Sequence, residues 1–463
     1  MTTIVEASVG DEAGAPALRR MLGVTDLTLL AMGTVIGSGI YLVPAVVLQQ
    51  TGGASGPALV VWLAAGVLSL LGALTYAEMG AMKPEAGGLY VYVRDSFGPL
   101  PAFLYGWTSF FVIASGSTAT LAVAFSGYLS EFVPLGRLAS RVVSVLMIVV
   151  IATINVRGTR KSATVQNWTT GVKVGALLLL STALLMFGRA PNEQAISWPA
   201  TFTPSLAVGM GAAMIGVLWA YEGWQYVTFS AGETRDAQRT FPLAITIATA
   251  ALVGLYLLVN LAYLAALGPL AASHSERIAA DAASVVLGHA AGMVVGALIL
   301  VSIFSAANGL ILTAPRVYFA MARDGVFFRR LAVVSPRFGT PAFAIIATAL
   351  WAAVLAVSGT FEQLLTFVVF TGWIFYALGA LSVFVYRRRL PNAHRPFRVP
   401  GYPVTPLLFV LSALGLVLNT VVTQPLRAAT GIGVVLLGTP AFFIWRARSR
   451  RDERPVAPTG TEV

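Results

Sequence analysis

The chain has 463 residues, 57% of them hydrophobic and only 11% charged, which excludes a water-soluble domain because one core cannot bury that much apolar surface. Its net charge of +11 comes without a basic, aromatic groove, so we expect no nucleic-acid partner. The absence of cysteine and the isolation of all three histidines argue against disulfides, thiolate chemistry and a metal site. The sequence therefore predicts an all-α integral membrane protein in a lipid bilayer.

Twelve apolar stretches are long enough to cross a bilayer as helices. They are predicted near residues 24–49, 57–82, 98–128, 139–156, 164–188, 206–231, 242–268, 285–321, 341–358, 364–386, 404–423 and 428–446. Residues 1–20 lack the basic start and apolar centre of a signal peptide and are predicted to be a disordered cytoplasmic tail. A second cytoplasmic tail is predicted at residues 448–463.

Lysine and arginine set the predicted orientation, because cytoplasmic loops retain them. With an even number of spans and both termini inside, most of the 30 basic residues fall in cytoplasmic loops or tails. We therefore expect a multi-pass protein of the plasma (inner) membrane with both termini in the cytoplasm. This topology also explains the net positive charge.

The first span is interrupted by the run Gly33–Tyr41, of sequence GTVIGSGIY. An unwound segment inside a bilayer is tolerated only where protein, water or a ligand satisfies its backbone groups. In one interpretation, Gly33 and Gly37 form a GxxxG surface for helix packing. In the other, the free amides of a new helix that starts after Gly37-Ser38-Gly39 attract an anion. A substrate carboxylate fits this second interpretation.

The sixth predicted span carries a second interruption, Trp219–Gln225, of sequence WAYEGWQ. Interrupted spans at corresponding positions of two halves indicate an inverted-repeat secondary transporter with a site near the membrane midplane. The sequence thus predicts one five-span repeat at residues 21–203, a second at 204–390, and two further spans at 391–447.

Glu222 lies beside Gly223 in the second interruption, near the expected centre of the bilayer. A charged group there is costly, which makes it a functional hypothesis. Three interpretations stay open: a protonated carboxyl that couples transport to protons, a carboxylate that holds a substrate ammonium, and a solvated residue that only lines the pathway. Trp219 is either a gate over the site or a packing residue.

Lys173 is the other intramembrane charge, roughly 14 Å into the fifth span, where reaching the surface is difficult. Its ammonium could occupy a position where another transporter would bind sodium. Ser302 and Ser305 of the eighth span offer oxygens for it, with Asn308 one turn further on. The alternatives are snorkelling of the lysine and ordinary interhelical hydrogen bonding by the polar residues of the eighth span.

Five ordered stretches resemble the amino acid–polyamine–organocation superfamily, and within it the L-type amino acid transporters and their bacterial relatives. They are GTVIGSGIYLVP, YAEMGAMKPEAGGLYVYVRDSFGPLPAFLYGW, WAYEGWQYVTFSAGETRDAQRTFPLAI, NGLILTAPRVYFAMARDGVFF and HRPFRVPGYPVTP. The resemblance covers residues 20–446. It implies twelve transmembrane helices in a leucine-transporter-type fold, with a 5+5 inverted repeat plus two C-terminal helices.

The resemblance also implies a substrate site between the two interruptions. It places the substrate carboxylate at the amides of Ser38, Gly39 and Ile40, and the α-ammonium at carbonyls around Ile36, Trp219 and Glu222. The other residues expected at this site are Gly37, Ala220 and Tyr221. Lys173 matches a lysine that takes the place of a sodium ion, which implies sodium-independent transport.

The sequence departs from the mammalian L-type proteins in two respects. Those proteins are linked by a disulfide to a glycoprotein subunit, which a chain without cysteine cannot be, and they carry glycine where this chain has Glu222. We expect a sodium-independent amino acid transporter that works alone as exchanger or proton symporter, without a cofactor. The alternative is an amine permease of the same fold, for polyamines or ethanolamine. An enzyme is not expected, since no HExxH, GxSxG or paired-acid motif occurs.

Overall fold

The computed structural model describes residues 18–190, 196–359 and 361–452. Within these ranges the regular elements are all helices, and one isolated parallel bridge joins Leu22 to Thr234. Residues 1–17 of the predicted N-terminal tail and residues 453–463 of the predicted C-terminal tail lie outside the described residues. The last helix continues to Asp452, so its final residues fall within the predicted C-terminal tail.

The helices of the first half of the chain run from Val24 to Phe187. They are α1 Val24–Val35, α2 Gly39–Gln50, α3 Ser55–Met82, α4 Leu89–Phe97, α5 Pro99–Thr108, the π-helix η1 Ser109–Ile113, α6 Ala114–Leu129, α7 Arg137–Val156 and α8 Thr159–Phe187.

The helices of the second half begin at Pro204, where the second repeat is predicted to start. They are α9 Pro204–Ala220, the 3-10 helix η2 Trp224–Glu233, α10 Ala237–His274, α11 Ile278–Leu287, α12 His289–Thr313, α13 Pro315–Arg323, the 3-10 helix η3 Arg329–Ala332, α14 Ala342–Ser358, α15 Phe361–Arg389, α16 Val404–Thr423 and α17 Pro425–Asp452.

Among the described residues, ten helices are long and apolar enough to cross a membrane, and the bent pair α1 and α2 makes an eleventh. The predicted span at 341–358 corresponds to α14, an apolar helix of 17 residues. Its length of about 26 Å falls short of a hydrocarbon core of about 30 Å. The count of twelve spans and the inverted repeat therefore stay predictions.

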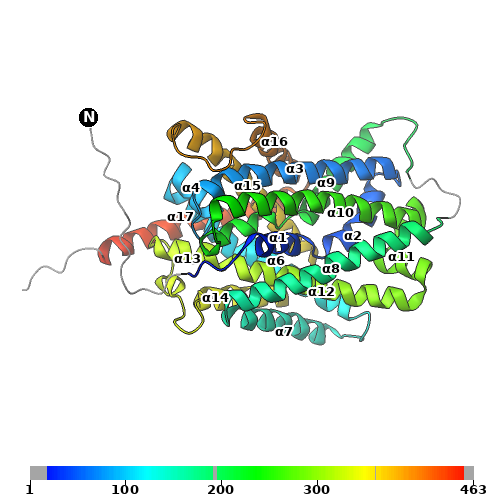
Figure 1. Cartoon of the computed structure of the whole chain (residues 1–463), viewed down its shortest axis with the longest axis horizontal. Helices are drawn as coiled ribbons and strands as arrows, with labels where there is room; N and C mark the ends of the chain where they lie inside the picture. Colours follow the sequence, from blue (N-terminus) through cyan, green and yellow to red (C-terminus); the bar gives the residue numbers. More distant parts are fainter. Residues whose placement is uncertain (1–17, 191–195, 360, 453–463) are drawn as a thin grey trace, which may run out of the picture.

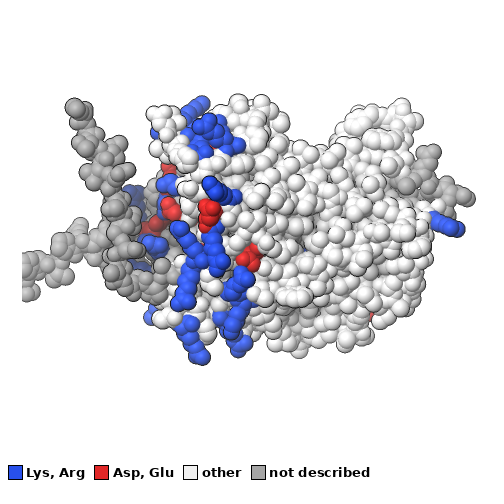
Figure 2. Space-filling view, in the orientation of Figure 1, with Lys and Arg blue, Asp and Glu red and all other residues white. Residues whose placement is uncertain are grey.

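Large apolar side chains on the outer helices are exposed, as is typical of a surface that faces lipid. Leu146 of α7, Leu179 of α8 and Leu350 of α14 expose 56%, 75% and 65% of their surface. Figure 2 shows a wide band without charge across the middle of the visible face, and most of the visible Lys and Arg gathered at one end. That end carries α4 and α13 in Figure 1, and we call it the basic end. This pattern supports a multi-pass membrane protein.

The helices pack as two groups around the first span. α3 packs along α10, while α2 packs against α9 and α10, and we call α1, α2, α3, α9, η2 and α10 the bundle. α12 packs against α6, α7 and α8, with α14 against α6 and α7, and we call α6, α7, α8, α12 and α14 the scaffold. Helix α1 contacts both groups, through α10 on one side and α8 and α12 on the other. The interruption in the first span therefore lies between bundle and scaffold (Figure 1).

Candidate functional site

The first span breaks between Val35 and Gly39, and α1 and α2 are bent by 44° at the break. Residues 36–38 have no helical pattern, so the first amides of α2 have no carbonyl one turn earlier to bond. In the part of the chain that the structure describes, none of the hydrogen bonds uses the N–H groups of Ser38, Gly39 and Ile40. The hydroxyl of Ser38 is also buried without a partner there. Four donors at a positive helix end form a place for an anion.

The sixth span breaks after Ala220, and a three-residue turn leads into η2. Gly223 in this turn has φ 136°, which L side chains rarely adopt. A Cβ there would lie 2.8 Å from the Val35 nitrogen and 2.9 Å from the Thr34 carbonyl carbon. Glycine therefore lets the second break touch the first, so two interruptions far apart in sequence form one site.

Tyr256 of α10 joins the two breaks from behind. Its hydroxyl lies 3.2 Å from the carbonyl oxygen of Ala220 and 3.3 Å from that of Val35, and it donates to them. The side chain is fully buried, with its ring edge-on to Trp62 at 5.6 Å. Tyr256 thus gives the Ala220 carbonyl a partner and adds a second one to the Val35 carbonyl, which also accepts from the Gly37 amide at 2.8 Å. Unpaired carbonyls would be costly in a bilayer.

A pocket of about 420 Å³, part of it open to solvent, lies between the two breaks. Six of the nine predicted site residues line it: Gly37, Ser38, Gly39, Trp219, Ala220 and Glu222. The other three are buried and do not line it: Ile36, Ile40 and Tyr221. Tyr221 instead packs with Tyr256 and Trp62 in an aromatic cluster. The structure therefore brings most of the predicted residues together.

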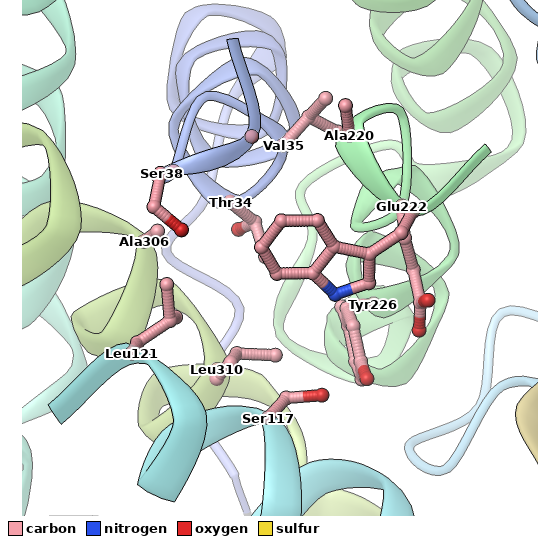
Figure 3. A pocket seen from close by; sticks show the side chains of 13 residues that line it. Thr34, Val35, Ser38, Ser117, Leu121, Ala220, Glu222, Tyr226, Ala306 and Leu310 are labelled. Carbon is pink, nitrogen blue, oxygen red and sulfur yellow. The ribbon is translucent and has the colours of Figure 1, made fainter. Parts of the chain in front are cut away.

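The rest of the pocket wall comes from residues that the sequence analysis did not identify. They are Thr34 and Val35 before the first break, Ser117 and Leu121 of α6, Tyr226 of η2, and Ala306 and Leu310 of α12. Helices α6 and α12 are unbroken here, so no local irregularity marks their residues. Figure 3 shows Ser117, Leu121 and Leu310 on the wall of the pocket opposite the two breaks. The scaffold thus forms the wall opposite the bundle.

The three glycines of the first break have different roles. A Cβ on Gly33 would lie 2.1 Å from side-chain atoms of both Gln166 and Thr170, so Gly33 packs against α8. Gly37 lines the pocket, and a Cβ there would meet only ordinary contacts at 3.4 Å and beyond. A Cβ on Gly39 would lie 2.8 Å from the Cα of Ala220. Within the GxxxG pair, Gly33 therefore packs against a neighbouring helix, whereas Gly37 lines the pocket.

Glu222 lies across the pocket from Ser38, beside Tyr226 (Figure 3). Its Oε1 accepts a hydrogen bond from the Tyr376 hydroxyl at 2.7 Å and one from Gln225 Nε2 at 3.4 Å. Its Oε2 is buried and has no partner among the described residues. The pocket is therefore polarised, with free donors on the side of the first break and the acidic residue Glu222 on the side of the second.

Lys173 of α8 is fully buried and holds the first break from the scaffold side. Its Nζ donates to the carbonyl oxygens of Gly33 and Ile36, both at 2.6 Å, and to that of Ser302 at 3.4 Å. Three donors of one ammonium thus meet three carbonyls. The Ser302 hydroxyl donates to the Ile36 carbonyl at 3.0 Å, while Ser305 pairs with Thr169 at 2.9 Å and makes no contact with Lys173 that the structure records.

A buried ion pair that the sequence analysis did not identify lies at the end of η2. Arg316 of α13 and Glu233 are 0% and 1% exposed, and Arg316 Nε donates to Glu233 Oε2 at 2.6 Å. Thr159 donates to Glu233 Oε1 at 2.8 Å. The Glu233 carbonyl accepts from the amides of Met21 and Leu22. This cluster ties the segment before α1 to η2, α8 and α13.

Comparisons with known proteins show the family of this chain. Residues 22–442 match the family model described as amino acid permease. The chain is 32% identical to b(0,+)-type amino acid transporter 1 of Mus musculus, over 89% of this chain and 85% of that protein. It is 30% identical to the serine/threonine exchanger SteT of Bacillus subtilis, over 93% and 98%. It is 31% identical to the cystine/glutamate transporter of Homo sapiens, over 91% and 85%.

Proposed function

Because this chain belongs to the amino acid permease family, we propose that it is a sodium-independent exchanger of amino acids in the plasma membrane. Membership of this family makes it a transporter and not an enzyme. The observation that carries the proposal is the pair of facing helix breaks with a polarised pocket between them. The chain has no cysteine, so it has no disulfide-linked subunit.

The substrate backbone fits the polarity of the pocket. The carboxylate binds the free amides of Ser38, Gly39 and Ile40, where the helix end is positive. The α-ammonium binds carbonyls of the second break, at Glu222 and at Trp219, whose oxygen also accepts from the Glu222 amide at 2.9 Å. The Ile36 carbonyl was expected to share this task, but it already accepts hydrogen bonds from Lys173 and Ser302, which occupy its two lone pairs. Ile36 therefore acts through Lys173 rather than through the substrate.

Alternating access follows from the two groups of helices that form the pocket. The bundle supplies both breaks, and the scaffold supplies α6 and α12 as the opposite wall. Rocking of the bundle against the scaffold would expose the pocket to one side of the membrane and then to the other. If the protein without substrate reorients slowly, it works as an exchanger. If the protein without substrate reorients freely and a carboxyl carries a proton, it works as a proton symporter.

Sodium independence rests on Lys173. A sodium ion in a transporter of this kind is coordinated by carbonyl oxygens of unwound helices. Here the ammonium of Lys173 holds such carbonyls, those of Gly33 and Ile36, at 2.6 Å. A fixed positive charge in that place leaves no need for a sodium ion and excludes one by repulsion.

The experiment that tests the function is sodium-free uptake of a labelled amino acid mixture into proteoliposomes. Vesicles preloaded with unlabelled amino acids are compared with empty vesicles, and vesicles without protein serve as control. Uptake only into preloaded vesicles supports an obligatory exchanger. Equal uptake into both contradicts exchange and favours a symporter or facilitator. No uptake of amino acids by protein that transports labelled putrescine or ethanolamine contradicts the proposal and favours an amine permease.

A further inference from the structure

A second pocket lies at the end of the molecule opposite the basic end. It is formed where α6 ends, where α11 crosses, and where α12 begins (Figure 1). Including the part open to solvent, its volume is about 710 Å³. None of the residues that line it belongs to the central pocket. It is therefore a separate cavity.

The rim of this pocket carries one guanidinium between two carboxylates. Arg277 NH1 donates to Glu131, which follows α6, and Arg277 NH2 lies 3.9 Å from Oδ1 of Asp281 in α11. The three side chains are 48%, 45% and 39% exposed. Ion pairs with this exposure contribute little to stability and are easily exchanged for other partners. The rim can therefore exchange one of these ion pairs for a charged ligand at little cost to the stability of the fold.

Apolar groups form the floor, and one lining residue, Tyr128, carries a hydroxyl that is unpaired among the described residues. Gly296 of α12 lies so close to Phe132 that a Cβ would be 2.8 Å from its ring, and Met293 on the same helix is 51% exposed. The hydroxyl of Tyr128 is buried and has no partner in the ranges that the structure describes. An apolar floor below a charged rim, with a free hydrogen-bonding group, is typical of a small-molecule site.

The same two scaffold helices line both pockets. Along α6, Tyr128 lies seven residues after Leu121 of the central pocket, a rise of about 10 Å. Along α12, Gly296 lies ten residues before Ala306 of the central pocket, a rise of about 15 Å. The second pocket therefore lies about 10–15 Å from the central pocket along α6 and α12, the two scaffold helices that both pockets share.

We propose that this second pocket, which we call the outer pocket, binds zwitterionic amino acids at the mouth of the transport path. The proposal rests on the proposed function, since it takes the substrate backbone as ligand. The ligand carboxylate replaces Glu131 on Arg277, and the ligand ammonium pairs with Glu131 and Asp281. Each charge of the rim then keeps a partner, which neither a simple amine nor a simple acid can offer. An apolar substrate side chain packs on Phe132 and Met293.

The affinity follows from the exposure of the rim. Solvated ion pairs of this kind are weak, so we expect a Kd of about 1–5 mM. Weak binding suits a site that must pass its ligand on to the central pocket. L-leucine tests the site because its side chain fits an apolar floor. Isopentylamine and 4-methylpentanoate are the matched controls, since each keeps the side chain and only one of the two charges.

The absence of cysteine allows a direct measurement. A single cysteine at Ser284, which lines the outer pocket, is labelled by a membrane-impermeant maleimide, and Ala139→Cys at the start of α7 is the exposed control at the same end. L-leucine at about 30 mM is expected to slow labelling of Ser284→Cys roughly tenfold, because at the expected Kd it would occupy about nine tenths of the outer pockets. Labelling of Ala139→Cys is expected to stay unchanged. The amine and the acid are expected not to protect. Arg277→Gln in the Ser284→Cys background is expected to remove the protection. Met293→Cys replaces Ser284→Cys if that variant does not fold.

Further outcomes separate the alternatives. Protection that disappears when Gly39→Ala closes the central pocket would show that the central site causes it, and would overturn the proposal. Protection in phosphatidylethanolamine nanodiscs without leucine, absent in detergent, would assign the outer pocket to a lipid headgroup. If the same variants take up amino acids but L-leucine does not protect the cysteine, the proposal of an outer binding site is refuted and the proposed function is not. No uptake of any amino acid by the wild-type chain would refute the proposed function.

Discussion

Removal of the Lys173 charge should stop sodium-free exchange. Two of the hydrogen bonds of Lys173 are 2.6 Å long, and each connects a charged donor to a carbonyl of the unwound segment. A hydrogen bond to a charged group contributes about 1.5–3 kcal/mol, so the pair contributes about 3–6 kcal/mol. Since about 1.4 kcal/mol corresponds to a factor of ten, we expect Lys173→Met to lower the exchange rate at least about 100-fold.

Two substitutions at this position test whether the Lys173 ammonium takes the place of a sodium ion. Lys173→Met fills the space of the lysine stem, whereas Lys173→Ala leaves a cavity beside the carbonyls of Gly33, Ile36 and Ser302. Both variants should fail without sodium. Only Lys173→Ala, whose cavity can hold a sodium ion, should regain part of its activity in about 0.15 M sodium chloride. The control is choline chloride at the same ionic strength. Lys161→Met changes an exposed lysine at the start of the same helix and should exchange normally.

The assay is exchange of a labelled amino acid in proteoliposomes, together with thermal unfolding of each purified variant. Undiminished sodium-free exchange by Lys173→Met would refute the reasoning, because the ammonium would then be only a structural group. Loss of activity in a variant that no longer folds would be uninformative about transport. For this reason a variant is scored only if its size-exclusion profile matches that of the wild type.

Three other predictions follow from the same contacts. Gly39→Ala should abolish exchange, because its Cβ would lie 2.8 Å from the Ala220 backbone, while Gly37→Ala should retain measurable exchange since its Cβ meets nothing closer than 3.4 Å. Glu222→Gln should fold normally and flatten the pH dependence of net uptake, and an unchanged pH profile would remove this carboxyl from coupling. Arg316→Met should lower the unfolding temperature, because it leaves a buried carboxylate unpaired at a cost of about 3–5 kcal/mol, and recovery by a second change, Glu233→Gln, is the check.

The two helix breaks could be predicted from the sequence because each violates a local rule. Glycine and serine in the middle of an apolar span are unfavourable for a continuous helix, so the runs at residues 33–41 and 219–225 indicated unwinding without any knowledge of the fold. The structure has a break in both runs. Glu222 and Lys173 could be identified for a similar reason, since a charge inside an apolar span is costly.

The other half of the pocket could not be predicted in this way. Ser117 and Ala306 lie in unbroken apolar helices, where small residues usually serve helix packing, so nothing in the sequence sets them apart. Tyr256 looks like one more aromatic residue in a span, and only the fold shows that its hydroxyl reaches two carbonyls. The partner of Glu233 is Arg316, 83 residues later in the chain, and a pairing over that distance has no local signal.

The contacts that hold the first break divide into two kinds. Tyr256 connects Val35 to Ala220, and all three residues belong to the bundle, so these contacts persist if the bundle rocks as one body. Lys173 and Ser302 belong to the scaffold and hold the Ile36 carbonyl of the bundle, so their contacts must lengthen or exchange partners when the bundle moves. Lys173 is therefore placed to bias the equilibrium between the two access states, and Tyr256 to preserve the shape of the site in both. A protein built this way can lose transport through Lys173 without losing its substrate pocket.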